Sequence, residues 1–212
     1  MPTALADYRT RIRNMLVDTL AARYPNTQVD EALRQVLTEY SETLPQVLTG
    51  SVTVSAAGRD QALSALTNPK HILKILYPYT AAADPDLINY PAWYSTYTSG
   101  SPMVHMGGDS IPQVGQVLYV IYAAPHTIKD LDSATLTTIM PQHDTYITIG
   151  AAGLCALQRG SSLIEAFTSR SSDVAQLLAF GNMQLNLFRR FLASMKDASY
   201  PPGNLSGQWS LD

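Results

Sequence analysis

Hydrophobic residues recur every three or four positions along the first forty residues, which is the spacing of one face of an α-helix. This spacing predicts a helix over residues 3–22, with Leu20 on its apolar face, and a second helix that ends before Pro45. Tyr24 and Pro25 interrupt the pattern, and Thr27 is placed to cap the second helix, with acidic residues in its first turn. The chain is therefore expected to begin with two antiparallel helices.

After Pro45 the pattern changes to short alternating segments, which are typical of half-buried β-strands. Residues 116–124 are apolar on both faces, so they predict a strand in the centre of a sheet. Gly107 and Gly108, with Asp109 beside them, suit a tight turn and predict a hairpin between this strand and the one before it. The middle third predicts an antiparallel β-region of about five to six strands.

Helical spacing returns at Pro141. Residues 141–160 contain small side chains that permit close helix packing, and Gly160 is expected to end this helix. Residues 171–195 form the clearest helical pattern of the chain. The predicted fold class is α+β: a bundle of N- and C-terminal helices in the order α-α … α-α, around a central antiparallel β-region.

These patterns set the predicted boundaries of the helices, the β-region and the domain. Residues 1–44 and 141–196 are assigned to helices, 45–125 to the β-region, and residues 1–198 together to a single domain. Residues 199–212 have no periodicity, contain Pro-Pro and Gly, and form a predicted extended C-terminal arm. The arm carries large apolar side chains that suit a groove on a partner, a hypothesis weighed evenly against plain disorder. They are Tyr200, Leu205, Trp209 and Leu211.

Charge is scarce in this chain. Charged residues make up 15% of it, against roughly 25% in typical domains. The net charge is −3 and no run of Lys or Arg occurs, which argues against tight binding of nucleic-acid phosphates. A surface of low charge favours assembly, because fewer ions have to be desolvated at an interface. No membrane-spanning run and no signal-peptide core are seen, so synthesis in the cytoplasm is expected.

Gly108-Asp109-Ser110 resembles the nucleophile block of one esterase class. In that class the serine lies near the N-terminus, between a strand and a helix, and an Asp-x-x-His motif follows. Here Ser110 lies mid-chain between two predicted strands, and no aspartate has a histidine three residues later. The turn interpretation is favoured, and Ser110→Ala is expected to change almost nothing.

No other residue pattern predicts chemistry. The four histidines are isolated, so metal binding is not predicted. Cys155 lies in an apolar segment and is expected in the core, and neither glycine-rich phosphate motif occurs. We therefore predict no catalytic residue, no metal, no cofactor and no enzymatic activity.

Aromatic residues cluster at Trp93, Tyr94 and Tyr97. Such a cluster can stack on a sugar or a base, but half-buried strand neighbours and interface anchors are more common. An interface or core role is favoured.

Three stretches resemble the head–tail adaptor (connector or neck) proteins of tailed bacteriophages, a group that includes podovirus tail tubular protein A. The first runs from "LADYRTRIRNMLVDT" to "ARYPNTQVDEALRQVLTEYSETLP". The second is "SPMVHMGGDSIPQVGQVLYVIYAAPHTI", and the third is "LTTIMPQHDTYITIGAAGLCALQRG". Together they span most of residues 5–195, and their order, more than any single motif, carries the resemblance.

The resemblance implies a structural virion protein at the head–tail junction. Members form homo-oligomeric rings, usually of twelve subunits, between the portal protein and the tail or nozzle proteins, and genomic double-stranded DNA passes through with transient, non-specific contact. It implies no membrane partner. The arm of residues 199–212 would dock on the portal, and Trp93, Tyr94 and Tyr97 would belong to a tail-side interface.

Three alternatives stay open at this point. The first is another phage tail-completion or baseplate component. The second is a serine hydrolase built on a β-rich fold, and the third is a carbohydrate-binding β-module that uses the aromatic cluster.

Overall fold

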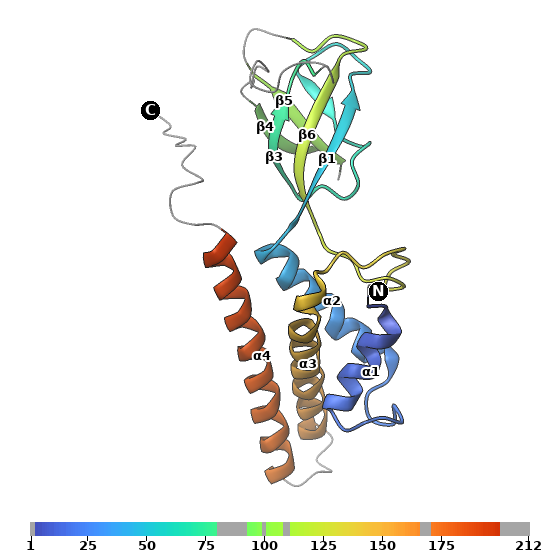
Figure 1. The fold of residues 1–212 in the computed structure, drawn as a ribbon, viewed down its shortest axis with the longest axis vertical. Coiled ribbons are helices and arrows are strands. Elements are labelled where there is room, and N and C mark those ends of the chain that lie inside the picture. Colours follow the sequence, from blue (N-terminus) through green and yellow to red (C-terminus); the bar gives the residue numbers. More distant parts are fainter. Residues whose placement is uncertain (1–2, 80–92, 99–100, 108–110, 166–170, 200–212) are drawn as a thin grey trace. The chain divides into compact units, whose positions relative to one another are not determined.

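A computed structural model describes residues 3–79, 93–98, 101–107, 111–165 and 171–199. The fold is α+β, as predicted, with four helices and two antiparallel sheets (Figure 1). The helices are α1 Leu5–Met15, α2 Asn26–Thr43, α3 Asp144–Glu165 and α4 Ser171–Ser199. The strands are β1 Gln46–Thr53, β2 Asp60–Ala62, β3 His71–Leu76, β4 Trp93–Thr98, β5 Ser101–Met106 and β6 Val117–Ala124.

The chain divides into two compact units. Met1–Leu44 and His126–Asp212 form one, called the helical unit here, and Pro45–Pro125 form the other, called the sheet unit. The chain enters the sheet unit at residue 45 and leaves it after residue 125, which are the limits of the predicted β-region. The assignment of residues 1–198 to a single domain stays a prediction, and the arm of residues 199–212 lies, apart from Ser199, outside the described residues.

Two three-stranded sheets make up the sheet unit, in the orders β1-β6-β3 and β2-β5-β4. The central position predicted for residues 116–124 is confirmed, because β6 pairs with β1 on one side and β3 on the other. Its side chains alternate between half-buried and buried from Val117 to Tyr122, and Ala123 and Ala124 at its end are both buried. Buried residues of both sheets share one core, among them Val52, Val104 and Leu118.

The predicted hairpin between β5 and β6 is wrong. β5 pairs with β2 and β4, whereas β6 belongs to the other sheet. Glycine-rich sequence predicts a change of chain direction but not which strand becomes the neighbour, since that depends on pairings between distant residues. Gly108, Asp109 and Ser110 lie outside the described residues.

The first helix ends earlier than predicted. α1 stops at Met15, and Val17 has a left-handed φ of 53°, a rare conformation for a β-branched residue. The buried carboxylate of Asp18 accepts the backbone N–H groups of Ala22, Arg23 and Tyr24 at 2.8–3.2 Å. These bonds stabilise a loop over residues 16–24, so Leu20 does not lie on a helical face and is 89% exposed.

Two predicted helix ends are also wrong. α2 begins one residue before Thr27, and Pro25 occupies its N-cap position. α3 continues through Gly160 to Glu165. A Cβ atom on Gly160 would lie 2.5 Å from Cδ2 of Leu178, so this glycine makes room for α4 and does not end the helix.

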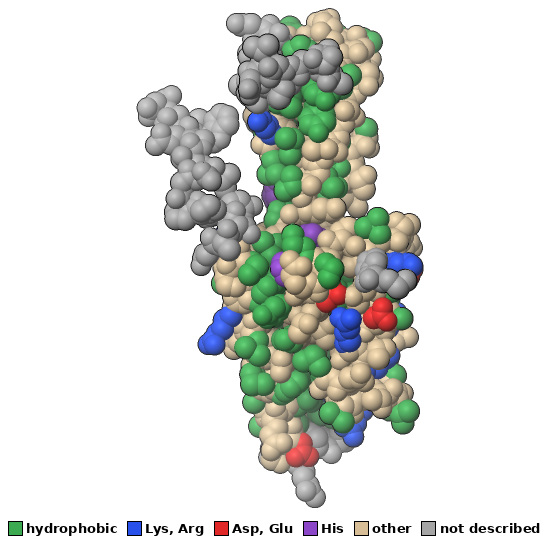
Figure 2. Space-filling view, in the orientation of Figure 1, with side chains coloured by type: hydrophobic (Ala, Val, Ile, Leu, Met, Phe, Trp, Pro, Cys, Tyr) green, Lys and Arg blue, Asp and Glu red, His purple; other side chains and the backbone are tan. Residues whose placement is uncertain are grey.

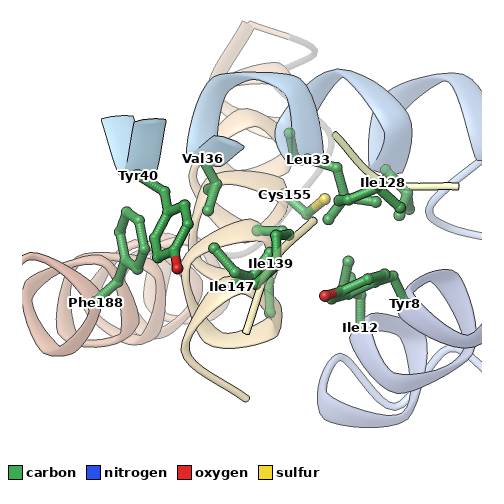
Figure 3. Close-up of a cluster of buried hydrophobic side chains, with 14 of the residues drawn as sticks. Tyr8, Ile12, Leu33, Val36, Tyr40, Ile128, Ile139, Ile147, Cys155 and Phe188 are labelled. Atoms are coloured by element: carbon green, nitrogen blue, oxygen red, sulfur yellow. The ribbon is translucent and has the colours of Figure 1, made fainter. Parts of the chain in front are cut away.

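The core of the helical unit is a single cluster that all four helices share (Figure 3). Tyr40 of α2 and Phe188 of α4 lie at one end of it, and Tyr8 and Ile12 of α1 lie at the other. Ile147 of α3 lies between these ends and is fully buried. α3 is therefore the central helix, on which the other three pack.

The closest approach between α3 and α4 occurs where two glycines face each other. A Cβ atom added to Gly153 would lie 2.9 Å from the carbonyl oxygen of Gly181, and a Cβ on Gly181 would lie 2.9 Å from the carbonyl oxygen of Gly153. The two backbones thus touch directly, in the way that small residues permit at helix crossings. Because the obstructing atoms belong to the backbone, a side chain at either position cannot be accommodated by a rotamer change.

We predict that Gly153→Ala and Gly181→Ala each lower the free energy of unfolding by about 1–3 kcal/mol, because the new methyl group forces the helices apart. The direction of the change in the free energy of unfolding is informative, because alanine in place of glycine in an unconstrained helix would stabilise that helix by roughly 0.5–1 kcal/mol. Urea denaturation measures the effect. Asn182→Ala, at the exposed neighbouring position, is the control and should change stability by less than about 0.5 kcal/mol. A stabilised Gly181→Ala protein would contradict the close crossing.

Candidate functional site

The residues that could carry chemistry do not converge on one site in the described part of the chain. No group of three or more His, Cys, Asp and Glu residues there is arranged to hold a metal ion. Cys155 is buried, and burial raises the pKa of its thiol to about 12, so the sulfur stays protonated at neutral pH. The prediction that the protein is not an enzyme stays a prediction.

One pair of polar residues was missed by the sequence reasoning. His105 on β5 and Asp60 on β2 face each other across the strand pairing, and Nδ1 of His105 lies 2.7 Å from Oδ1 of Asp60. Forty-five residues separate them, so no local motif could reveal the pair. Such a pair orients an imidazole, which is one element of a hydrolase site. Ser110, the nucleophile of that alternative, lies outside the described residues.

Asp144 forms a buried polar junction between the start of α3 and the N-terminal segment. Thr3 Oγ1 and Tyr8 OH each donate a short hydrogen bond to one oxygen of its carboxylate. Nη1 of Arg11 lies 3.7 Å from Oδ2. Burial, and then the adjacent Asp144, raise the pKa of Tyr8, so this hydroxyl remains a donor. A negative charge at a helix N-terminus is also favourable, and the junction thus fixes α1 against α3.

A second polar junction lies where the chain leaves the helical unit and where it returns. Nε2 of His126 lies 2.9 Å from the carbonyl oxygen of Leu44, and the backbone N–H of His126 donates to Oγ of Ser41 at 2.9 Å. Nδ1 lies 3.1 Å from both the hydroxyl and the carbonyl oxygen of Thr138. Both ring nitrogens therefore have hydrogen-bond partners within the helical unit. His126 therefore holds residues 44 and 126 side by side.

The two histidines of this region are poor candidates for catalysis. Burial lowers the pKa of both His126 and His143. His143 Nδ1 bonds the hydroxyl of Tyr40 at 2.8 Å, and burial raises the pKa of that tyrosine to about 12. The ring of Tyr40 also lies against His126. The polar atoms of the two histidines and of Tyr40 thus bind one another or the backbone of the same unit, as is typical of side chains that stabilise a fold.

The outer face of α3 and α4 is the most unusual surface of the helical unit. No charged residue occurs between Asp173 and Arg189, although this stretch of α4 is exposed on one side. Met183 and Leu187 are 52% and 43% exposed, and Figure 2 shows hydrophobic side chains following α3 and α4. Depletion of charge with retention of apolar groups is the composition of interface centres.

A groove lies between the start of α3 and the second half of α4. Its volume is ≈ 480 Å³. The ring of Tyr146 stacks on that of Phe191, with centroids 3.9 Å apart and planes 4° apart. The rest of the lining is mixed: Leu187 and Met195 are apolar, Arg190 is a cation, and Gln142, His143 and Ser194 are polar. An aromatic floor bordered by polar groups and one cation has the mixed composition of a protein interface.

The residues predicted as interaction sites are only partly within the described chain. Trp93 is half-buried and packs against the core of the sheet unit, which agrees with a core role for this residue. Tyr94 and Tyr97 lie on β4, paired with His105 and Pro102, but their side chains are outside the described set. The predicted arm residues Tyr200, Leu205, Trp209 and Leu211 lie outside it as well. The part of the helices that the structure describes includes no segment long and apolar enough to cross a membrane.

Comparisons with known families, curated proteins and solved structures give the following results. No protein-family model matches the chain, and no curated protein matches it. A solved structure entitled "Neck of empty GTA particle computed with C6 symmetry" matches with 14% sequence identity and a TM-score of 0.33, over 71% of this chain and 76% of the other. A match at this TM-score and identity establishes neither a family nor a function.

We predict that Tyr8→Phe lowers the free energy of unfolding by about 1–3 kcal/mol, because one buried oxygen of Asp144 loses its hydrogen-bond donor. Thermal or urea denaturation measures the loss. Tyr146→Phe is the matched control: its ring keeps the stacking on Phe191, its position is exposed, and a change below about 0.5 kcal/mol is expected. Equal effects of the two substitutions would show that the Asp144 junction contributes nothing.

We predict that the protein becomes less stable as the pH falls below about 6.5, the ordinary pKa of histidine. His126 has a lowered pKa when folded, so below this value the unfolded chain binds more protons than the folded one. The slope is at most about 1.4 kcal/mol per pH unit for one group, and His143 adds to it in the same direction. His126→Gln should destabilise the protein at pH 7.5 yet reduce the further loss measured at pH 5.5. An unchanged loss in the variant would exclude His126 as a source.

Proposed function

We propose that this protein is a structural component of a tailed-phage-like particle, namely a head–tail adaptor that forms a ring between the portal and the tail. The observation that carries the proposal is the uncharged, partly exposed apolar face of α3 and α4, on a chain whose order of elements resembles that adaptor family. A protein that works alone in water has little reason to keep such a face. A protein that functions by assembly requires one.

The charge balance supports a passage for DNA. A channel lined with many Lys and Arg residues would bind genome phosphates and slow their movement, since each neutralised phosphate adds to the affinity. The chain has 14 basic and 17 acidic residues. Several cations are also paired within the helical unit: Arg9 with Asp30, Arg34 with Asp132, and Arg189 with Glu39. Contact with DNA would then be transient and non-specific.

The proposed partners are the portal protein on one side, tail or nozzle proteins on the other, and further copies of the same chain around the ring. Twelve copies are expected from the resemblance. The arm of residues 199–212 is proposed to dock on the portal through its apolar side chains, and Trp93, Tyr94 and Tyr97 are proposed for the tail side. Assembly would place the protein in the virion after synthesis in the host bacterial cytoplasm.

The decisive experiment locates the protein in particles. Antibodies raised against the purified chain should label one end of the head, at its junction with the tail, in electron micrographs of purified particles. Label on the tail tip would favour the alternative of a baseplate component. Absence of the protein from purified particles would overturn the proposal.

We predict that removing residues 199–212 abolishes binding to the portal and leaves the fold intact. The reason is that these residues are proposed for docking only. Co-sedimentation with portal rings measures binding, and the melting temperature measures the fold. A full-length variant with Asn204→Ala and Ser206→Ala is the control and should bind as the wild type does. Undiminished binding by the truncated protein would exclude the arm as the portal contact.

A further inference from the structure

The loop over residues 16–24 presents two large hydrophobic side chains to solvent. Val17 is 84% exposed and Leu20 is 89% exposed, more than the other large hydrophobic residues in the described part of the chain. We call this pair the apolar knob. The four hydrogen bonds that Asp18 accepts hold the loop, and Tyr24, at its end, is buried beneath the guanidinium of Arg159. The knob is thus a fixed projection, whose ordering costs little when it binds.

A complementary surface lies on the helical unit itself. Phe180, Met183 and Leu187 follow one another at helical spacing on α4, and we call them the α4 strip. Phe180 is half-buried and the other two are largely exposed, so the strip forms a shallow apolar surface. At one end it continues into the groove floored by Tyr146 and Phe191.

The loop that carries the knob and the helix that carries the α4 strip are separated by α3 within the same compact unit. In Figure 1 the loop that follows α1 lies on one side of α3, and α4 lies on the other. A fixed projection and a receiving surface that α3 separates do not meet within one molecule. They can meet between two copies, and repetition of that contact closes into a ring when the rotation per copy divides the circle.

We propose that the apolar knob of one copy packs on the α4 strip of the next copy, as the contact that joins neighbouring subunits. This proposal rests on the proposed function in one respect: the adaptor function is the reason to expect that the repeated contact closes into a ring. It is heterologous, because two different surfaces of the chain meet in it. Insertion of Val17 and Leu20 would cover the apolar groups of both surfaces at once, which is the main driving force for association.

Charges at the edges of the two surfaces agree with this pairing. Arg23 is exposed and follows Leu20 by three residues. Asp173 is exposed in the first turn of α4, about 10 Å along the helix from Phe180. With Leu20 on the α4 strip, opposite charges would border the contact on both copies, which favours a second copy of this chain over a lipid surface or an unrelated partner.

Cross-linking of cysteine variants tests the contact. The only native cysteine, Cys155, is buried and its pKa is raised, so the wild-type chain serves as the unreactive control. We expect an equimolar mixture of Leu20→Cys and Met183→Cys proteins to form a covalent dimer with a short bis-maleimide, whereas each variant alone gives little covalent dimer. The double variant should give a ladder that ends at the size of the ring.

The outcomes separate this contact from the function proposed above. Dimers formed by Leu20→Cys alone as efficiently as by the mixture would show a symmetric contact and overturn the proposal. If the mixture of the two variants gives no covalent dimer, the proposal is overturned, whether light scattering shows the protein to be an oligomer or a monomer. A cross-linked ladder from a protein that is absent from particle necks would support the contact while the neck function fails.

A substitution without cysteine chemistry gives a second readout. Leu20→Ser removes the knob's most exposed side chain, and we expect it to weaken self-association at least about tenfold with the melting temperature unchanged. Leu136→Ser is the matched control, because Leu136 is also exposed, at 52%, but belongs to neither surface. Equal weakening by both substitutions would overturn the role of the knob.

Discussion

The direct contact between the backbones of α3 and α4 at Gly153 and Gly181 is the constraint on which the helical unit depends. Because neither residue has a side chain, the helices approach closely enough for Phe188 to reach the core beside Val36 of α2. A Cβ atom on Gly150 would lie 2.9 Å from the ring of Phe188, so a third glycine takes part in the same approach. The crossing therefore decides which face of α4 is buried, and with it which face remains outside.

The face left outside explains why α4 looks unlike an ordinary surface helix. A helix that only covers a core has one apolar stripe and a charged opposite side. In α4 the stripe toward the core contains Leu185 and Phe188, and a second group, Met183 and Leu187, lies toward solvent in the stretch between Asp173 and Arg189 that has no charged residue. The helical spacing in the sequence picks out the first group, and Met183 and Leu187 lie outside it. Burial within the single chain separates them, and so points to assembly.

Much of the fold could be predicted from the sequence, because helical and alternating periods are local properties. The wrong predictions concern helix ends and strand pairing, which depend on side-chain contacts or on residues distant in the sequence. A carboxylate that binds three backbone N–H groups ends α1, and the side chain of Leu178 explains why Gly160 stays helical. β5 belongs to its sheet because it pairs with Asp60–Ala62, which lie some forty residues earlier in the sequence. The Asp60–His105 pair and the apolar knob depend on tertiary structure in the same way.

The conformation of Val17 connects these points. A β-branched residue with positive φ costs about 1–3 kcal/mol, and native structures retain such costs mainly where a function requires the geometry. A polar residue at position 20 would satisfy the loop's hydrogen bonds equally well, since Asp18 makes them through the backbone. The fold alone therefore gives no reason for two exposed hydrophobic side chains on a strained loop. A contact that buries them in a second molecule supplies that reason.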